Sequence, residues 1–200
     1  MVFNDINWKQ FIEKGDETSF STLYNRYVDD LFSYGMSLGF QKEACKDAIQ
    51  DTFYKLYISR AKLRHISNAT AYIFKSYKHR LIDMYRGSIK GESIEPLTET
   101  FAMQVTALDT MIDIENTRLL KDKVASLLES LTPNQREVVY LKYMIGLQHK
   151  EIGEILDIRE ESARKLLYRS MEKLREQVTQ KDFLEAFSGL ALPLWLSGIL

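Results

Sequence analysis

The chain has 200 residues, of which 45% are hydrophobic and 28% charged, and its formal net charge is −1. This length suffices for one medium-sized domain or two small ones, and the hydrophobic fraction excludes a disordered chain. A single cysteine, Cys45, excludes an internal disulfide and a cysteine-rich metal site. The first ten residues lack the basic start and apolar run of a signal peptide. We therefore expect a globular cytoplasmic protein.

Helical periodicity dominates the first part of the chain, and strand-like alternation is scarce, which predicts an all-α protein. Residues 7–40 are expected to form two helices separated by Gly15, with Asp16 as the N-cap of the second. A third helix is predicted over 42–57. Four of its residues recur at helical spacing and share one polar side: Asp47, Gln50, Asp51 and Tyr54.

Residues 59–68 are predicted to form a loop, followed by a fourth helix over 69–86. Between Arg60 and Lys90 there are eight Lys and Arg residues against one acid, Asp83. Aromatic faces stack on unpaired bases and cations follow phosphates, so this helix is a candidate for binding melted DNA. Its candidate residues are Tyr72, Lys75, Lys78, His79, Arg80 and Arg86. An ordinary amphipathic helix with a cationic outer face is the alternative.

Residues 87–116 carry six acids against one lysine and little periodicity, which predicts an acidic linker over 89–116. Helical periodicity returns at Thr117. Thr132 is then expected to cap a helix that has Pro133 in its first position and Gln135 completing a capping box.

The segment 149–169 has the pattern of a helix-turn-helix. Gly153 and Ala163 are small where two helices cross closely, and Asp157 lies in the turn, where a left-handed backbone is usual. The second helix is expected to point its polar residues outward, suitably for a major groove. These candidates are Arg159, Glu160, Ser162, Arg164, Lys165, Tyr168 and Arg169. The alternatives are a structural hairpin without DNA and, for Glu160, an acid that compensates the helix dipole.

Taken in this order, the motifs resemble the extracytoplasmic-function (ECF) group of bacterial sigma factors, from about residue 16 to 176. The resemblance is carried by 47–57 (DAIQDTFYKLY), 71–74 (AYIF), 81–86 (LIDMYR), 131–138 (LTPNQREV), 150–156 (KEIGEIL) and 174–176 (LRE).

The resemblance implies an all-α fold of two small helical domains joined by a linker. These would be a sigma region 2 four-helix domain (1–88), the linker (89–116), a sigma region 4 helix-turn-helix domain (117–179) and an apolar tail (180–200). The polar side with Asp47, Gln50, Asp51 and Tyr54 would dock on the clamp helices of core RNA polymerase. The implied role is promoter-specific transcription initiation, which requires no catalytic residues, cofactor or metal.

By the same resemblance, the fourth helix and the loop 61–68 would recognise the melted minus-ten element of promoter DNA. The helix-turn-helix would read the minus-thirty-five element as duplex, and the linker would thread the RNA-exit path. Four departures from the family pattern bear on promoter sequence. His79 replaces a usual Asn, Asp157 a usual Gly and Arg159 a usual capping Ser, and Ser162-Ala163 replaces a common Thr-Val pair.

The tail 183–200 is apolar but contains Glu185 and Pro193, so no stable membrane span is expected. We expect it to dock on the protein itself or on a partner such as an anti-sigma factor.

Two other functions are compatible with parts of the sequence: a conventional helix-turn-helix transcription regulator and a helical interaction module that binds no DNA. An enzyme is the least expected, because His65, His79 and His149 are scattered and no glycine-rich phosphate loop is present.

Overall fold

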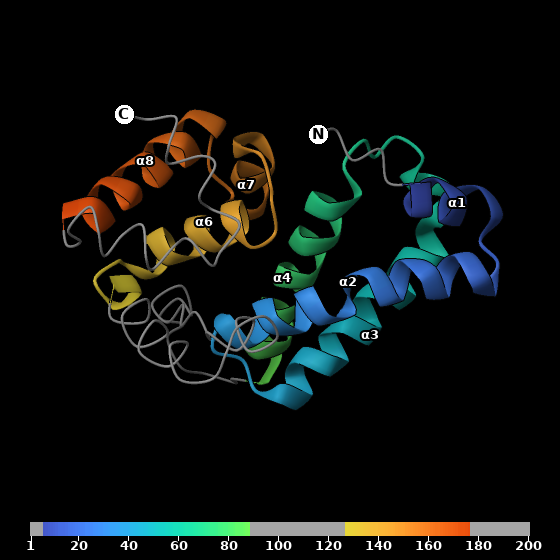
Figure 1. Ribbon diagram of the computed structural model, residues 1–200. Helices are drawn as coiled ribbons and strands as arrows, with labels where there is room; N and C mark the ends of the chain where they lie inside the picture. Colours follow the sequence, from blue (N-terminus) through green and yellow to red (C-terminus); the bar gives the residue numbers. More distant parts are fainter. Residues whose placement is uncertain (1–5, 89–126, 177–200) are drawn as a thin grey trace, which may run out of the picture.

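The computed structural model describes residues 6–88 and 127–176, and every regular element within these two ranges is a helix (Figure 1). The all-α prediction is therefore confirmed. The predicted linker 89–116 and tail 180–200 lie outside the described residues. None of the described helices combines the length and the apolar character that crossing a membrane requires.

The first domain has four α-helices and one short 3-10 helix. They are α1 (Ile6–Lys14), α2 (Glu17–Ser37), α3 (Lys42–Ser59), η1 (Arg60–Leu63) and α4 (Ala69–Ser88). The predicted loop 59–68 is thus partly helical. Arg60 keeps right-handed helical angles (φ −50°, ψ −40°), so the chain passes from α3 into η1 without a break.

Local signals set the start of α2, and the core of the first domain follows from its apolar stripes. The Asp16 carboxylate accepts a hydrogen bond of 2.8 Å from the Ser19 backbone N–H, as the N-cap prediction requires. Among the fully buried side chains are Leu23, Leu31, Tyr34, Phe53, Tyr77 and Leu81. Gly35 lies against this core so closely that a Cβ there would be 2.1 Å from the Tyr77 hydroxyl oxygen. Only glycine fits at this crossing of α2 and α4.

The second domain comprises α6 (Pro133–Tyr143), α7 (His149–Leu156) and α8 (Glu160–Glu176). Thr132 and Gln135 form the predicted capping box, with Pro133 in the first turn. Gly146, with φ of +81°, ends the segment after α6 in the left-handed region, where glycine is least strained. The buried side chains that hold the three helices together include Val138, Leu141, Ile152, Ile155, Ala163 and Leu174.

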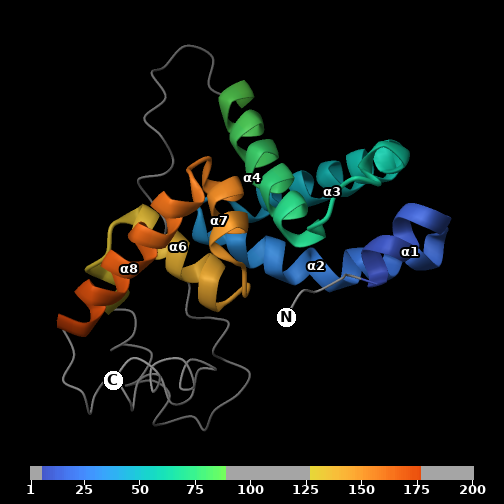
Figure 2. The same ribbon diagram turned by 90° about the horizontal axis from the view of Figure 1, so that it is seen from above.

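The two domains pack against each other, and α7 lies between α8 and α4 (Figures 1 and 2). On the side of α2, the ring of Tyr34 stacks on Tyr140 of α6, with 5.8 Å between centroids and 17° between planes. Both rings are buried, and the buried residues of the two domains form one hydrophobic cluster. We call this packing of the second domain on α2 and α4 the closed arrangement.

Candidate nucleic-acid interface

The turn between α7 and α8 has the geometry that its sequence predicts. Asp157 adopts left-handed angles (φ 54°, ψ 38°), and its backbone N–H donates to the Gly153 carbonyl. The Ile158 N–H donates to the same carbonyl at 3.0 Å. A Cβ at Gly153 would lie 2.8 Å from the Ile158 backbone oxygen, so a larger residue would push the turn away from α7. Gly153 and Asp157 together fix the direction in which α8 leaves the turn.

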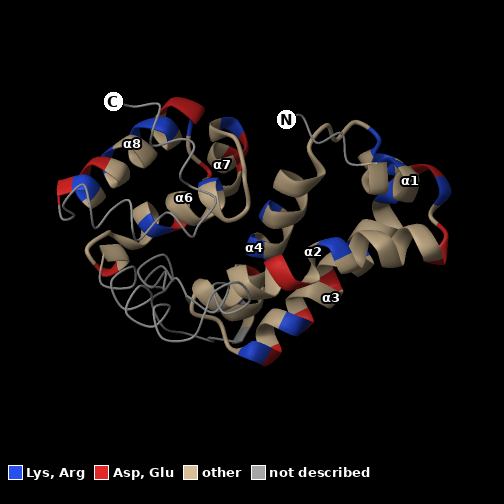
Figure 3. Cartoon of the chain, in the orientation of Figure 1, with Lys and Arg blue, Asp and Glu red and all other residues tan. Residues whose placement is uncertain are grey.

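Helix α8 presents its predicted polar residues to solvent. Ala163 and Leu167 face the core, while all seven candidates are exposed: Arg159, Glu160, Ser162, Arg164, Lys165, Tyr168 and Arg169. Tyr168 is 62% exposed, and a hydrogen bond with Glu172 raises the pKa of its hydroxyl. Figure 3 shows the mixture of basic and acidic positions along this helix. An exposed helix with cations, hydroxyls and one aromatic ring is suited to contact phosphates and base edges in a major groove.

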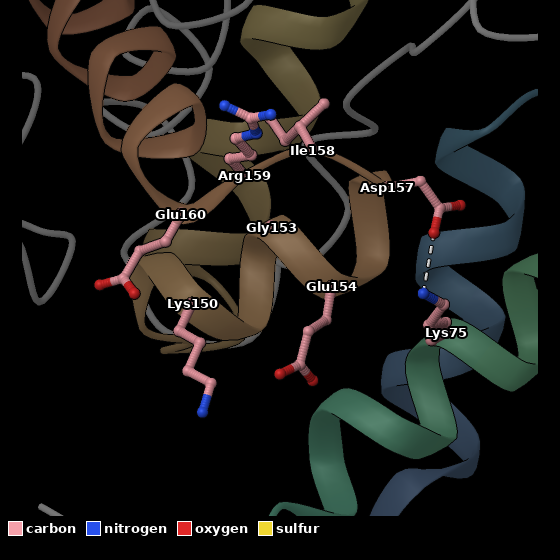
Figure 4. Close-up of a pocket in the computed structure, with 8 residues that line it drawn as sticks. All are labelled: Lys75, Lys150, Gly153, Glu154, Asp157, Ile158, Arg159 and Glu160. Carbon is pink, nitrogen blue, oxygen red and sulfur yellow. Dashed lines mark hydrogen bonds and ion pairs between the residues drawn. The ribbon is translucent and has the colours of Figure 1, made fainter.

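An open cleft of about 590 Å³ lies between α4 and the start of α8. Figure 4 shows Lys75 of α4 reaching across to Asp157 in the turn. The cleft is also lined by two further cations, Lys150 and Arg159, and by two further acids, Glu154 and Glu160, so charges of both signs lie beside the N-terminal end of α8. Nearby, burial and then the charge of Lys142 lower the pKa of His149, which favours its neutral form.

Acids contact the predicted DNA-binding side of α4. The Nζ atom of Lys75 is 2.8 Å from Oδ1 of Asp157, and Nε2 of His79 is 3.3 Å from Oδ2 of the same carboxylate. The hydrogen bond from Lys75, with a further one from His79, lowers the pKa of Asp157. The predicted candidates Lys75 and His79 are thus both engaged by the second domain.

Lys78 is deeply buried between the two domains. Its Nζ donates to Oε1 of Glu137 in α6 at 2.8 Å, and the Tyr34 hydroxyl donates to the same oxygen. The side chains of Lys78 and Glu137 are 9% and 2% exposed. Burial, followed by the neighbouring Glu137 charge, raises the pKa of Tyr34 well above its ordinary value, so this phenol remains a hydrogen-bond donor. Lys78 therefore does not face solvent in the closed arrangement.

The remaining candidates of α4 differ in their surroundings. Arg80 forms an ion pair with Asp51 of α3, and Arg86 is exposed near the end of the helix. The ring of Tyr72 packs on Trp8 at 6.2 Å between centroids. Ahead of the helix, the Asn68 side-chain oxygen accepts from the Ala71 N–H at 2.8 Å, and its amide nitrogen donates to Glu151 of α7.

On α3, three of the four predicted polymerase-binding residues are exposed: Asp47, Gln50 and Tyr54. Asp51 is only partly exposed because it is held by Arg80. Tyr54 is 64% exposed and stands at the edge of a groove of about 480 Å³. The groove is lined by Phe20, Tyr24, Phe53 and Tyr57 as well as Glu17 and Gln50. The polar side of α3 therefore continues into an aromatic surface.

Sequence reasoning missed three residues: Glu137, which pairs with Lys78 of α4, Glu151, which contacts Asn68 just ahead of that helix, and Tyr34. Only the role of Asp157 could have been suspected from the sequence, because this carboxylate stands in a turn position where glycine is least strained.

The fold is similar to those of two solved structures. CnrH, solved in complex with the cytosolic domain of CnrY, superposes with a TM-score of 0.56 at 20% identity, covering 86% of this chain and 94% of that one. RpoE from Bartonella quintana, solved with the anti-sigma factor NepR, gives a TM-score of 0.53 at 18% identity, covering 80% of this chain and 96% of that one.

Curated relatives match most of the sequence. The ECF RNA polymerase sigma factor SigM of Bacillus subtilis (strain 168) is 24% identical over 155 residues, which are 76% of this chain and 91% of SigM. SigW of the same organism, also an ECF RNA polymerase sigma factor, is 25% identical over 179 residues, covering 84% of this chain and 92% of SigW.

Two family descriptions match the two helical domains in turn. Residues 23–88 match Sigma-70 region 2, and residues 121–174 match Sigma-70, region 4. The first match contains α3 and α4, and the second contains the helix-turn-helix. The chain accordingly belongs to the sigma-70 family and is an ECF sigma factor, which directs transcription initiation by RNA polymerase and is not itself an enzyme.

Proposed function

We propose that α8 reads the minus-thirty-five element of the promoter as duplex DNA. The observation that carries this is the exposure of all seven candidates, six of them on α8 and Arg159 just before it, where Gly153 and Asp157 fix the start of the helix. Arg164, Lys165 and Arg169 would meet guanine edges or phosphates, and Ser162 would reach either.

The minus-ten element would be bound, as unpaired bases, by α4 and by the segment 61–68 that precedes it. Lys75, His79, Arg80 and Arg86 would follow the phosphates, and Tyr72 would supply a face for stacking. Lys78 joins this set only when the second domain leaves α4, because Glu137 holds it in the closed arrangement.

Core RNA polymerase would bind the polar side of α3. Asp47, Gln50 and Tyr54 support this assignment because they are exposed on one side of the helix, while the buried residues of α3 face the core of the domain. Asp51 would contribute through its ion pair with Arg80, which ties the polymerase-binding side of α3 to the DNA-binding helix.

The proposed organisation is a region 2 domain (1–88), an acidic linker (89–116), a region 4 domain (117–179) and an apolar tail (180–200), in a cytoplasmic protein. RpoE of Bartonella quintana was solved with an anti-sigma factor. We propose that this chain is held by a partner of the same kind, for which the tail is a candidate docking segment.

Run-off transcription with core polymerase on a pool of genomic promoter fragments tests the proposed assignments. Tyr54→Arg is a sharper probe of polymerase binding than Asp51→Arg, because Tyr54 is exposed whereas Asp51 also holds Arg80. Arg164→Ala tests the minus-thirty-five contact. Lys9→Ala removes an exposed cation of α1 and is the matched control.

We expect promoter-specific initiation with wild type and Lys9→Ala, loss of polymerase binding with Tyr54→Arg, and weakened promoter binding with Arg164→Ala. Duplex binding without initiation would instead favour the conventional regulator. Absence of both DNA and polymerase binding, even after removal of residues 183–200, would favour the interaction module.

A further inference from the structure

The ring of Tyr72 lies where the core of the first domain meets the proposed single-strand surface. Its neighbours Ile73 and Phe74 are fully buried, whereas Tyr72 itself is partly exposed. Lys75 and His79 follow it at helical spacing, so these two cationic candidates and the ring share one side of α4. A ring at this border needs support from the core side if it is to present a fixed face to a base.

Trp8 of α1 supplies that support. Its ring centroid lies 6.2 Å from that of Tyr72, with 55° between the planes, which is a favourable arrangement for an aromatic pair. Trp8 is only 5% exposed, and the ring of Phe11 packs on it at 6.0 Å between centroids. The indole is therefore held in the core, and its influence on bound DNA would pass through Tyr72.

The turn after α1 contacts the proposed single-strand surface at a second place. Gly15 adopts a φ of +60°, and a Cβ there would lie 2.2 Å from Cζ of Arg60. The same guanidinium lies 5.7 Å from the ring centroid of Tyr57. Arg60 begins η1, which leads into the segment 61–68 that is proposed to bind the minus-ten element. Helix α1 and its turn thus contact the surface both at η1 and at Tyr72.

Helix α1 precedes the part of the chain that matches a family description. The match to Sigma-70 region 2 begins at residue 23, whereas α1 covers Ile6–Lys14. The buried side of α1, formed by Trp8, Phe11 and Ile12, explains why this helix stays on the domain. Burial alone would be satisfied by any apolar side chain of similar size, so the ring contact with Tyr72 calls for a separate explanation.

Fixing the Tyr72 ring before DNA arrives favours binding. A tyrosine without lateral contacts samples several staggered rotamers of its first side-chain torsion, and ordering such a side chain on binding lowers the affinity. Contact with Trp8 restricts this torsion in the unbound protein. A base would then stack on a ring that is already in place.

We propose that Trp8 is a positioning residue of the single-strand site, which holds the Tyr72 ring in the orientation on which an unpaired base of the minus-ten element stacks. This inference rests on the proposed stacking role of Tyr72. It adds α1 to the promoter-binding apparatus through a side chain that does not itself touch DNA.

Binding of single-stranded DNA to the holoenzyme tests this role. Core polymerase is combined with the full chain, and fluorescence anisotropy follows an oligonucleotide with the non-template sequence of a promoter recovered by run-off transcription. A set of oligonucleotides that each lack one base locates the stacked base. Its removal should weaken binding to wild type about tenfold and leave binding to Tyr72→Ala unchanged.

We expect Trp8→Leu to weaken binding of the complete oligonucleotide about tenfold and to abolish the sensitivity to that base, as Tyr72→Ala does. Because Trp8 would act through Tyr72, combining Trp8→Leu with Tyr72→Ala should add nothing to the effect of Tyr72→Ala alone. Trp8→Phe keeps a ring at this position and should preserve the sensitivity to the stacked base.

Phe11→Leu is the matched control, because it makes the same kind of change at a fully buried position of the same helix. The ring contacts of Phe11 among the described residues are with Trp8 and Phe20. This variant should lose stability yet keep the sensitivity to the stacked base. Thermal unfolding shows which variants are folded at the assay temperature, and Trp8→Met replaces Trp8→Leu if the latter does not fold.

Two results would overturn the positioning role while leaving the stacking role of Tyr72 intact. One is retained sensitivity to the stacked base in Trp8→Leu or Trp8→Met, and the other is an equal loss of sensitivity in Phe11→Leu. If Tyr72→Ala instead binds every oligonucleotide as wild type does, Tyr72 does not stack on DNA and the inference falls with it. Run-off transcription by the wild-type chain tests the sigma activity separately.

Discussion

Lys78 of α4 and Glu137 of α6 form a buried ion pair between the two domains, with 2.8 Å between Nζ and Oε1. Desolvation of two charges costs much of what their attraction contributes, but removing one partner leaves a buried charge without compensation. The closed arrangement thus requires this pair. The effect on stability of replacing Lys78 should depend strongly on whether Glu137 is present, and the reverse.

We expect Lys78→Met to destabilise the closed chain by about 3–5 kcal/mol. The loss cannot exceed the free energy of separating the two domains, because beyond that value the chain would open instead. Glu137→Leu should behave similarly. The double variant, which replaces the pair with two apolar side chains, should recover most of the loss. Urea unfolding of the four proteins gives the coupling energy, and a coupling near zero would show that the pair does not join the domains in solution.

Gly153→Ala should destabilise the second domain by about 1–3 kcal/mol, as overpacking does. The added Cβ would meet the Ile158 backbone oxygen at 2.8 Å, and a backbone atom in a tight turn cannot move aside. Gly87→Ala is the matched control, because a Cβ there meets nothing within 4 Å, and alanine in a helix is favoured by about 0.5–1 kcal/mol. Thermal unfolding should therefore shift in opposite directions for the two variants, and equal shifts would refute the close crossing.

Thr132→Ala should cost about 1 kcal/mol of stability, the usual loss for an N-cap. The Thr132 hydroxyl accepts from the Gln135 N–H, and the Gln135 side chain accepts from the Thr132 N–H. Thr22→Ala is the comparison, since Thr22 is exposed within α2 and its hydroxyl only donates back to the Thr18 carbonyl. Thr22→Ala should therefore leave the free energy of unfolding unchanged or raise it slightly. Urea unfolding of both variants beside wild type measures the two effects.

The stability of the second domain should fall as pH drops below about 6.5, the ordinary pKa of histidine. Burial lowers the pKa of His149 in the folded state, so the unfolded chain takes up the proton first. The stabilisation is complete above the unfolded pKa and is lost as pH falls toward the lower folded pKa. His149→Gln should remove this slope between pH 7 and 5, whereas His65→Gln, at an exposed position before α4, should leave it in place.

Several features followed from the sequence because their causes are local. The capping box at Thr132, the N-cap at Asp16 and the left-handed turn at Asp157 each depend on residues within a few positions of one another. The exposed side of α8 likewise follows from the 3.6-residue period once Ala163 faces the core. The segment 59–68 was less well predicted, since a single 3-10 turn leaves no periodic signal.

The partners of α4 could not be predicted from the sequence. Asn68, Lys75 and Lys78 meet acids that lie 83, 82 and 59 positions away. Helical periodicity places a charge on the outside of its own helix, but it does not say which other helix will cover that side. The sequence by itself determined the helices, their caps and the family. Only the tertiary structure decided that the second domain buries Lys78 of α4, pairs with Lys75 and His79, and leaves α8 exposed. That choice depends on how two separately formed apolar faces pack together.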